Sequence, residues 1–135
     1  EEWVICDTIF DEGTIIASEE FHVTAMIIGL NERIPKFTLE KEKLIDRLID
    51  LATHEEIDIN DKKFSHDFAL KGEDREEVLN YFTAEKIEFF NSQAPYHIES
   101  CGDMIIIFRN LRFATADEIR KLHTFAIALL KTLKS

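Results

Sequence analysis

The chain has 135 residues, of which 45% are hydrophobic and eleven are Phe, so it is long enough and apolar enough to fold as one domain around a buried core. It carries 27 acidic against 16 basic residues, and the formal net charge of -11 excludes nucleic acid and anionic membrane surfaces as partners, because both are bound through Lys and Arg. No apolar run reaches the roughly 20 residues that cross a bilayer, and the composition is too apolar for a disordered chain.

The first part of the chain has the signals of strands and turns. Residues 3–10 are rich in β-formers and end at a turn, Asp11-Glu12-Gly13. Residues 14–18 can return as a second strand. The stronger candidate is 21–28, which alternates and then becomes apolar on both sides, as a strand covered on both faces does. After a loop, residues 35–38 are predicted to be extended.

Residues 40–53 have the periodicity of an amphipathic helix. Its apolar positions form two adjacent edges of one stripe: Leu44, Leu48 and Leu51, and Ile45, Ile49 and Ala52. Charged residues fill the remainder of the helix surface. The next segment, 54–63, is polar and acidic and predicts a surface connection.

The middle of the chain is densely marked with turns and helix caps. A short strand at 68–70 runs into a turn at Gly72. Asp74, with a Glu three residues later, is an N-cap that predicts a helix, and Thr83 caps a second short helix. Two caps so close together imply a bend rather than one long rod, and Pro95 prevents further helix.

The last part of the chain predicts a β-hairpin and a long helix. Gly102-Asp103 suits a two-residue turn, and Met104–Phe108 is apolar on both faces, as a central strand is. Thr115 and Glu118 form a capping box in front of an apolar stripe. The turn sets a register with three opposed pairs: Cys101 with Met104, Glu99 with Ile106 and His97 with Phe108.

The order of elements is strand-strand(-strand)-helix-strand-helix-helix-strand-strand-helix. Because strands come in hairpins and helices do not alternate with them one for one, the fold class is α+β rather than a doubly wound parallel sheet. We predict an antiparallel sheet of about five strands with the helices packed on one face, in a single soluble domain over residues 1–135. The strand 3–10 is the expected edge of this sheet.

One polar set suggests chemistry: His97, Glu99 and Cys101 project from one face of a strand and are all of types that bind metal. Three successive positions on one strand face lie too far apart to close a tetrahedral site, and no CxxC or HExxH motif accompanies them. A half-exposed hairpin face is therefore the preferred interpretation. His22 and His66 are the further residues that a metal site could use.

The sequence predicts no catalytic residues and no cofactor. His66 and Asp67 adjoin a strand, where neighbouring side chains point to opposite faces and cannot pair. There is no G-x-S-x-G elbow, Walker loop or G-x-G-x-x-G motif, and no basic neighbour would lower the thiol pKa of Cys6 or Cys101. Two cysteines are too few for a disulfide framework, so we expect free thiols.

Two features could serve protein contacts. Phe89 and Phe90 are adjacent on a short helix, so they face different neighbours and one of them is a candidate for exposure. The edge strand 3–10 presents unpaired backbone groups, with which a second copy of the chain could pair to form a homodimer. No other protein partner is indicated.

Three stretches resemble a family of small uncharacterised bacterial proteins. Ile34–Leu39 followed by Glu40 is similar to LPxFxLxPE, Phe64–Asp74 to FSxxYxLxGxDE, and Phe82–Phe90 to FTxExIxFFE. The chain departs from this pattern at Glu40-Lys41, which replaces the Pro-Glu pair, and at Gln93-Ala-Pro95, which lacks the usual Gly-Trp approach to the hairpin. The resemblance covers most of residues 3–133.

In that family a soluble C-terminal domain follows N-terminal transmembrane helices. The resemblance therefore implies a membrane-associated protein whose anchor is missing from the chain. We expect this domain on the cytoplasmic side. The absence of an initial Met fits a domain excised from a longer protein. The resemblance to this family implies no catalytic residue in this chain. We expect a non-enzymatic module that works through protein contacts or a small ligand; the alternative is a small metal-binding or metal-dependent enzyme domain that uses His97, Glu99 and Cys101.

Overall fold

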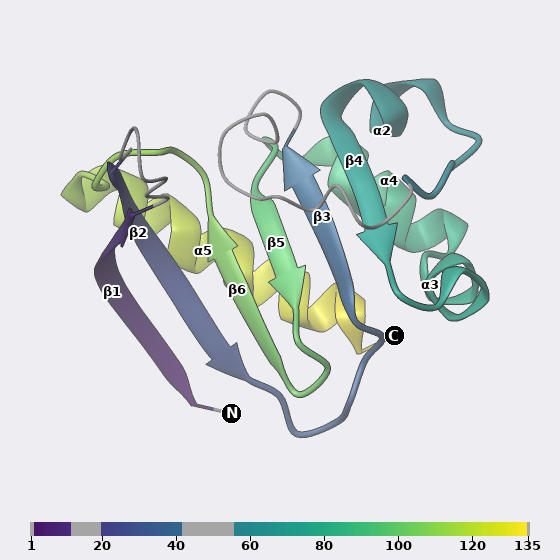
Figure 1. The fold of residues 1–135 in the computed structure, drawn as a ribbon, viewed down its shortest axis with the longest axis horizontal. Helices are drawn as coiled ribbons and strands as arrows, with labels where there is room; N and C mark the ends of the chain where they lie inside the picture. Colours follow the sequence, from purple (N-terminus) through teal and green to yellow (C-terminus); the bar gives the residue numbers. More distant parts are fainter. Residues whose placement is uncertain (1, 12–19, 42–55, 135) are drawn as a thin grey trace.

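The computed structural model describes residues 2–11, 20–41 and 56–134 (Figure 1). These residues form an α+β fold, an open antiparallel sheet of six strands with four helices, which confirms the predicted class. The strands are β1 (Trp3–Asp11), β2 (Glu20–Gly29), β3 (Phe37–Lys41), β4 (Phe68–Gly72), β5 (His97–Ser100) and β6 (Met104–Phe108). The helices are α2 (Lys62–Asp67), α3 (Arg75–Tyr81), α4 (Ala84–Ser92) and α5 (Ala116–Leu133).

The strand order in the sheet is β1-β2-β6-β5-β3-β4, and every neighbouring pair is antiparallel. The hairpin of β5 and β6 therefore lies in the middle of the sheet, although it comes late in the chain. The predicted central position of β6 and the predicted edge position of β1 are both confirmed. The predicted hairpin register is confirmed as well, since His97 pairs with Phe108 and Glu99 with Ile106.

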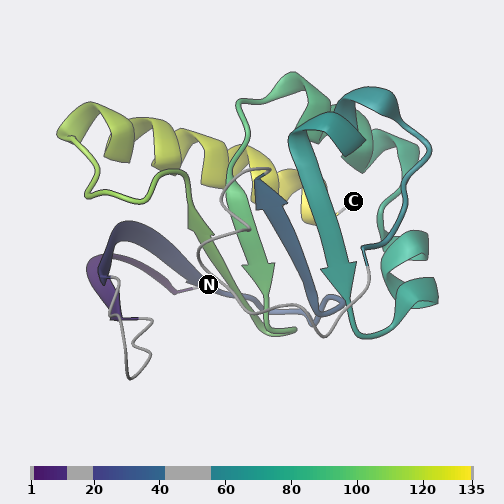
Figure 2. The same ribbon diagram turned by 45° about the horizontal axis from the view of Figure 1, so that its top comes forward.

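The four helices lie on one side of the sheet (Figures 1 and 2). The long helix α5 runs behind the strands in the view of Figure 1, while α2, α3 and α4 gather at the β4 end. We call the side of the sheet that packs on these helices the helix face, and the opposite side the second face. Because side chains alternate along a strand, each strand contributes to both faces.

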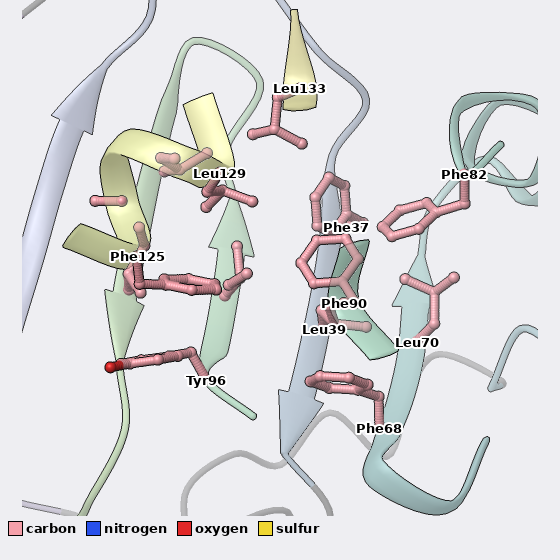
Figure 3. Packing of buried hydrophobic residues seen from close by; sticks show 14 of the residues in the cluster. Phe37, Leu39, Phe68, Leu70, Phe82, Phe90, Tyr96, Phe125, Leu129 and Leu133 are labelled. Atoms are coloured by element: carbon pink, nitrogen blue, oxygen red, sulfur yellow. The ribbon is translucent and has the colours of Figure 1, made fainter. Parts of the chain in front are cut away.

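The helix face holds the main hydrophobic core (Figure 3). Apolar residues of the strands interdigitate there with the buried stripe of α5 and with an aromatic group from α2, β4, α3 and α4. Phe90 is 1% exposed, and its ring centroid lies 5.3–6.3 Å from the centroids of four other Phe rings. Such rings bury large apolar areas and favour edge-to-face contacts. The aromatic residues of this group are Phe37, Phe64, Phe68, Phe82, Phe89 and Phe90.

Phe89 is not the exposed side chain that the sequence allowed. Phe90 is buried in the core, and Phe89 is partly buried, with its ring stacked on Phe125 of α5 at 6.0 Å. Both rings therefore join α4 to its neighbours. Phe89 and Phe90 therefore both serve internal packing and do not form a surface for a partner.

A smaller apolar cluster lies on the second face. Its buried members are Val23 and Ala25 of β2 and Phe108 of β6, with Ile106 and Leu111 packed against them. Strand β2 therefore contributes to both clusters: Met26 and Ile28 point to the helix face, and Val23 and Ala25 point to the second face. This explains why the sequence of β2 is apolar on both sides.

The predicted helix caps are all present. The Asp74 carboxylate accepts a hydrogen bond from the backbone N–H of Glu77 at 3.1 Å, and the Thr83 hydroxyl accepts one from Lys86 at 3.4 Å. Thr115 and Glu118 form the reciprocal capping box at the start of α5. These contacts satisfy N–H groups that a helix start leaves without partners.

Gly72 is required by close packing. A Cβ at this position would lie 2.7 Å from Cγ2 of Val78 and 2.9 Å from the carbonyl oxygen of Lys36. Gly102, in contrast, has a φ of 100°, the conformation that the first position of the predicted two-residue turn requires. The two glycines thus serve different physical needs.

Three predictions about local structure differ from the structure or fall outside it. Glu40 and Lys41 belong to strand β3, so the helix predicted over 40–53 does not begin at residue 40. The rest of that helix, and the strand predicted over 14–18, lie outside the described residues. Helix α2 was missed, because it has six residues and one buried side chain, too few for a periodic pattern.

Candidate functional site

Five polar residues come together on the second face, where three strands run side by side. Thr38 and Glu40 alternate with the buried core residues of β3, Lys71 lies on β4, and His97 and Glu99 lie on β5. In the sheet register Thr38 is opposite both Lys71 and Glu99. Continuing the β3–β5 register by one pair places Glu40 opposite His97. We call these five residues the second-face polar group.

Glu40 is a buried carboxylate without a hydrogen bond. Its side chain is 1% exposed, and neither Oε1 nor Oε2 has a hydrogen-bond partner in the described part of the chain. Lys71 Nζ lies 4.0 Å from Oε2, an ion-pair distance that is too long for a hydrogen bond. Burial raises the pKa of Glu40; the positive charge of Lys71 opposes this, and the carboxylates of Glu99 and Glu56 add to it.

His97 is the second buried polar side chain without a partner. It is 1% exposed, and its ring stacks on Phe108 with 4.4 Å between centroids. Neither Nδ1 nor Nε2 has a hydrogen-bond partner within the ranges that the structure describes. Burial lowers the pKa of His97 to about 4, so the imidazole is neutral at pH 7, with one N–H to donate and one nitrogen to accept.

A cavity of about 270 Å³ adjoins the polar group. Thr38, Lys71 and Glu99 belong both to the group and to the cavity wall, whereas Glu40 and His97 do not line it. The other polar residues of the wall are Lys36, Glu73, Ser100 and Cys101. Burial raises the pKa of Glu99, as it does for Glu40, so the cavity wall includes one carboxylate whose charged form is poorly solvated.

The structure places the predicted metal candidates along one stretch of chain. His97 and Glu99 are in β5, and Cys101 follows its last residue. Burial is the main cause that raises the pKa of the Cys101 thiol, and the neighbouring carboxylates of Glu99 and Asp103 raise it further. The raised pKa disfavours the thiolate, which is the form that binds metal. Across the described ranges, no three His, Cys, Asp or Glu side chains are grouped so that they could hold a metal ion.

His66 and Asp67 do form a pair, so the prediction that strand geometry would separate them is wrong. They occupy the last turn of α2 instead of a strand, and His66 Nδ1 lies 3.2 Å from Asp67 Oδ1. Lys63 Nζ contacts the other carboxylate oxygen at 3.0 Å. The side chain of His66 is 86% exposed, so this pair is on the surface. His22 is distant in sequence and in the sheet, with its ring 4.9 Å from that of Phe113.

Sequence interpretation missed Glu40 and Lys71 as members of the polar group. Glu40 was assigned to a helix and Lys71 to a turn. One signal could have found Glu40: Phe37, Thr38, Leu39 and Glu40 alternate apolar and polar, which is the period of a strand. The pairing of β3 with both β4 and β5, which brings the group together, has no local sequence signal.

Compared with family models, with curated proteins and with solved structures, the chain gives no significant match. Among the helices that the structure describes, none is both long enough and apolar enough to cross a membrane.

Proposed function

We propose that this domain is a non-enzymatic module that binds a small cationic ligand, an amine or a guanidinium, at the second-face polar group. The observation that carries the proposal is Glu40, a buried carboxylate with both oxygens free of hydrogen bonds in the described chain. An unsatisfied buried polar group costs about 1–3 kcal/mol, and more when it is charged. Native proteins retain such groups chiefly where they are used.

The charge balance around Glu40 favours a cation. Two further carboxylates, Glu99 and Glu56, act electrostatically on Glu40, and among the described residues Lys71 supplies the positive charge that opposes them. A ligand with N–H donors and a positive charge would supply the missing hydrogen bonds and offset the excess of negative charge. Neutral His97 can add one further hydrogen bond, and stacking on Phe108 holds its ring in place.

The cavity of about 270 Å³ provides an approach to the group, since Thr38, Lys71 and Glu99 line it; Glu40 itself does not line the cavity and would be reached past the side chains of Thr38 and Lys71, its neighbours in the sheet. A pocket with a few convergent polar groups and perturbed pKa values is the arrangement expected of a ligand site. A ligand that enters here would displace the Lys71 ammonium from its 4.0 Å contact with Glu40 or bind beside it.

Thermal melting with agmatine, which carries an amine and a guanidinium, tests the proposal. Agmatine should raise the melting temperature, because a ligand that binds the native state stabilises it, whereas a neutral alcohol of similar length should not. Glu40→Gln should abolish the shift, and Glu88→Gln, which removes the same charge from an exposed position on α4, should leave it intact.

The absence of any shift with agmatine and with other small amines would contradict the proposal, as would an undiminished shift in Glu40→Gln. The melting temperature should also be measured with added zinc. Stabilisation by zinc that is lost on changing His97, Glu99 or Cys101 would favour the alternative function, a metal-binding domain.

We also propose that the domain is carried by a membrane-anchored protein and lies on the cytoplasmic side. The resemblance of Ile34–Glu40, Phe64–Asp74 and Phe82–Phe90 to the family with transmembrane helices supports this. Fractionation of cells that make the natural protein tests it: the domain should sediment with membranes, and its recovery in the supernatant would contradict the proposal.

A further inference from the structure

Strand β1 forms a bare edge of the sheet. It has β2 on one side, and no described strand lies on its other side (Figure 1). The opposite edge, β4, differs, because Glu56 forms a bridge with Lys71 and the N–H of Ile57 donates to the carbonyl of Leu70 at 2.6 Å. An edge strand with free N–H and C=O groups is a template for another strand.

The backbone groups that β1 leaves free can be identified from its register. The N–H of Gly29 donates to the carbonyl of Glu2 at 2.9 Å, so Glu2 and Gly29 form a hydrogen-bonded pair. In an antiparallel ladder such pairs alternate, and the even-numbered residues of β1 therefore bond to β2. The N–H and C=O groups of Trp3, Ile5, Asp7 and Ile9 point outward, along the bare edge.

The side chains of β1 are also unusual for an edge. Val4, Ile5 and Ile9 are 54%, 40% and 57% exposed, and they are three of the five large hydrophobic side chains exposed in the described residues. Edge strands that stay unpaired usually carry Lys or Pro, and β1 has neither. Its one charged residue before the last position is Asp7, whose carboxylate accepts a hydrogen bond from the Thr24 hydroxyl of β2.

We propose that β1 pairs antiparallel with β1 of a second copy of this chain, so that one sheet runs through a two-fold symmetric dimer. This inference is independent of the ligand site. In a register centred on Cys6, Ile9 of one copy lies opposite Trp3 of the other, and Val4 lies opposite Thr8. The remaining pair places Ile5 opposite Asp7, so no two like charges face each other. Exposed apolar side chains of each copy then cover the partner's strand on both faces.

Charge selects this register. A register centred on Asp7 would place two carboxylates directly opposite each other, which is destabilising. A register centred on Ile5 would pair a shorter part of β1. The register centred on Cys6 gives the longest ladder without facing Asp7 residues, and it places the two Cys6 residues in a non-hydrogen-bonded pair, where Cα atoms are about 4.5 Å apart.

Sedimentation of the full 135-residue chain, from micromolar to near-millimolar concentration, tests the proposal. The chain should form a dimer as its concentration rises, and added salt should favour the dimer because each copy carries a net charge of -11. Ile5→Glu should abolish the dimer, because residue 5 of one copy faces Asp7 of the other in this register and two carboxylates would then lie directly opposite each other. The matched control is Ile127→Glu on α5, since Ile127 is 41% exposed and Ile5 is 40% exposed.

Cross-linking tests the register in the same protein. In a Cys101→Ser background, a short bismaleimide should join Cys6 of one copy to Cys6 of the other, and Ile5→Glu should prevent this. Ile9→Glu serves as the second disruptive variant if circular dichroism shows that Ile5→Glu is misfolded. A chain that stays monomeric throughout, a dimer that survives both glutamates, or a dimer that Ile127→Glu also abolishes would overturn the proposal.

Discussion

Acidification should destabilise the folded protein through His97. Its ring is 1% exposed, and burial lowers its pKa from the usual 6.5 to about 4. Between these two values the unfolded chain binds a proton that the folded protein does not, so the free energy of unfolding falls as the pH is lowered. A pKa difference of about 2.5, at about 1.36 kcal/mol for each pH unit, makes the loss about 3 kcal/mol by about pH 4.

Glu40 acts in the opposite direction over part of this range. Burial raises its pKa, so its contribution is present at low pH and is lost as the pH rises through the folded value. The contribution of His97 is therefore the difference between the wild type and His97→Gln, measured by urea unfolding from about pH 7 to about pH 4. The same comparison in a Glu40→Gln background removes any coupling between the two residues.

The wild type should lose about 3 kcal/mol more than His97→Gln over this range. His123→Gln, at an exposed position on α5, is the control and should follow the wild type. Parallel losses in the wild type and in His97→Gln would refute the reasoning, because they would show that the folded protein admits a protonated His97.

Three further changes test the packing and the caps by urea unfolding. Gly72→Ala should lower the free energy of unfolding by about 1–3 kcal/mol, because its Cβ would overlap neighbouring atoms. Gly29→Ala should change it by less than about 0.5 kcal/mol, because a Cβ there would lie 3.9 Å from the carbonyl oxygen of Glu2, an ordinary contact; equal effects would contradict the packing argument. Phe90→Ala should cost about 3–5 kcal/mol, and Phe113→Ala, at a position that is 38% exposed, much less; similar losses would place Phe90 outside the core. Thr115→Ala should cost about 1 kcal/mol by removing the cap of α5, and an unchanged midpoint would mean that the capping box adds nothing.

The elements that could be predicted are those whose signals are local. Asp74, Thr83 and Thr115 predict helix starts, because an N-cap is a contact between residues close in the sequence. The structure has a helix after each of these three caps. The turn at Gly102 fixed the register of the central hairpin for the same reason. The strand over residues 3–10 was expected at an edge of the sheet, and β1 is an edge strand.

The polar group could not be predicted in the same way, because it is assembled by pairing between distant strands. His97 and Glu99 were noticed, since they alternate on one strand. Glu40 and Lys71 reach them only because β3 lies between β4 and β5. The sequence also gave no sign that Glu40 and His97 would be almost fully buried, and burial is what perturbs their pKa values.

The central place of the β5–β6 hairpin has a consequence for synthesis of the chain. Strands β1 and β2 leave the ribosome early, and β3 and β4 follow, but the strands that join these two pairs begin only at His97. Until then a nascent chain holds two strand pairs whose inner edges have no partner, a state that invites aggregation. Chains released before His97 should therefore be readily digested by protease, and chains that extend through α5 should resist it.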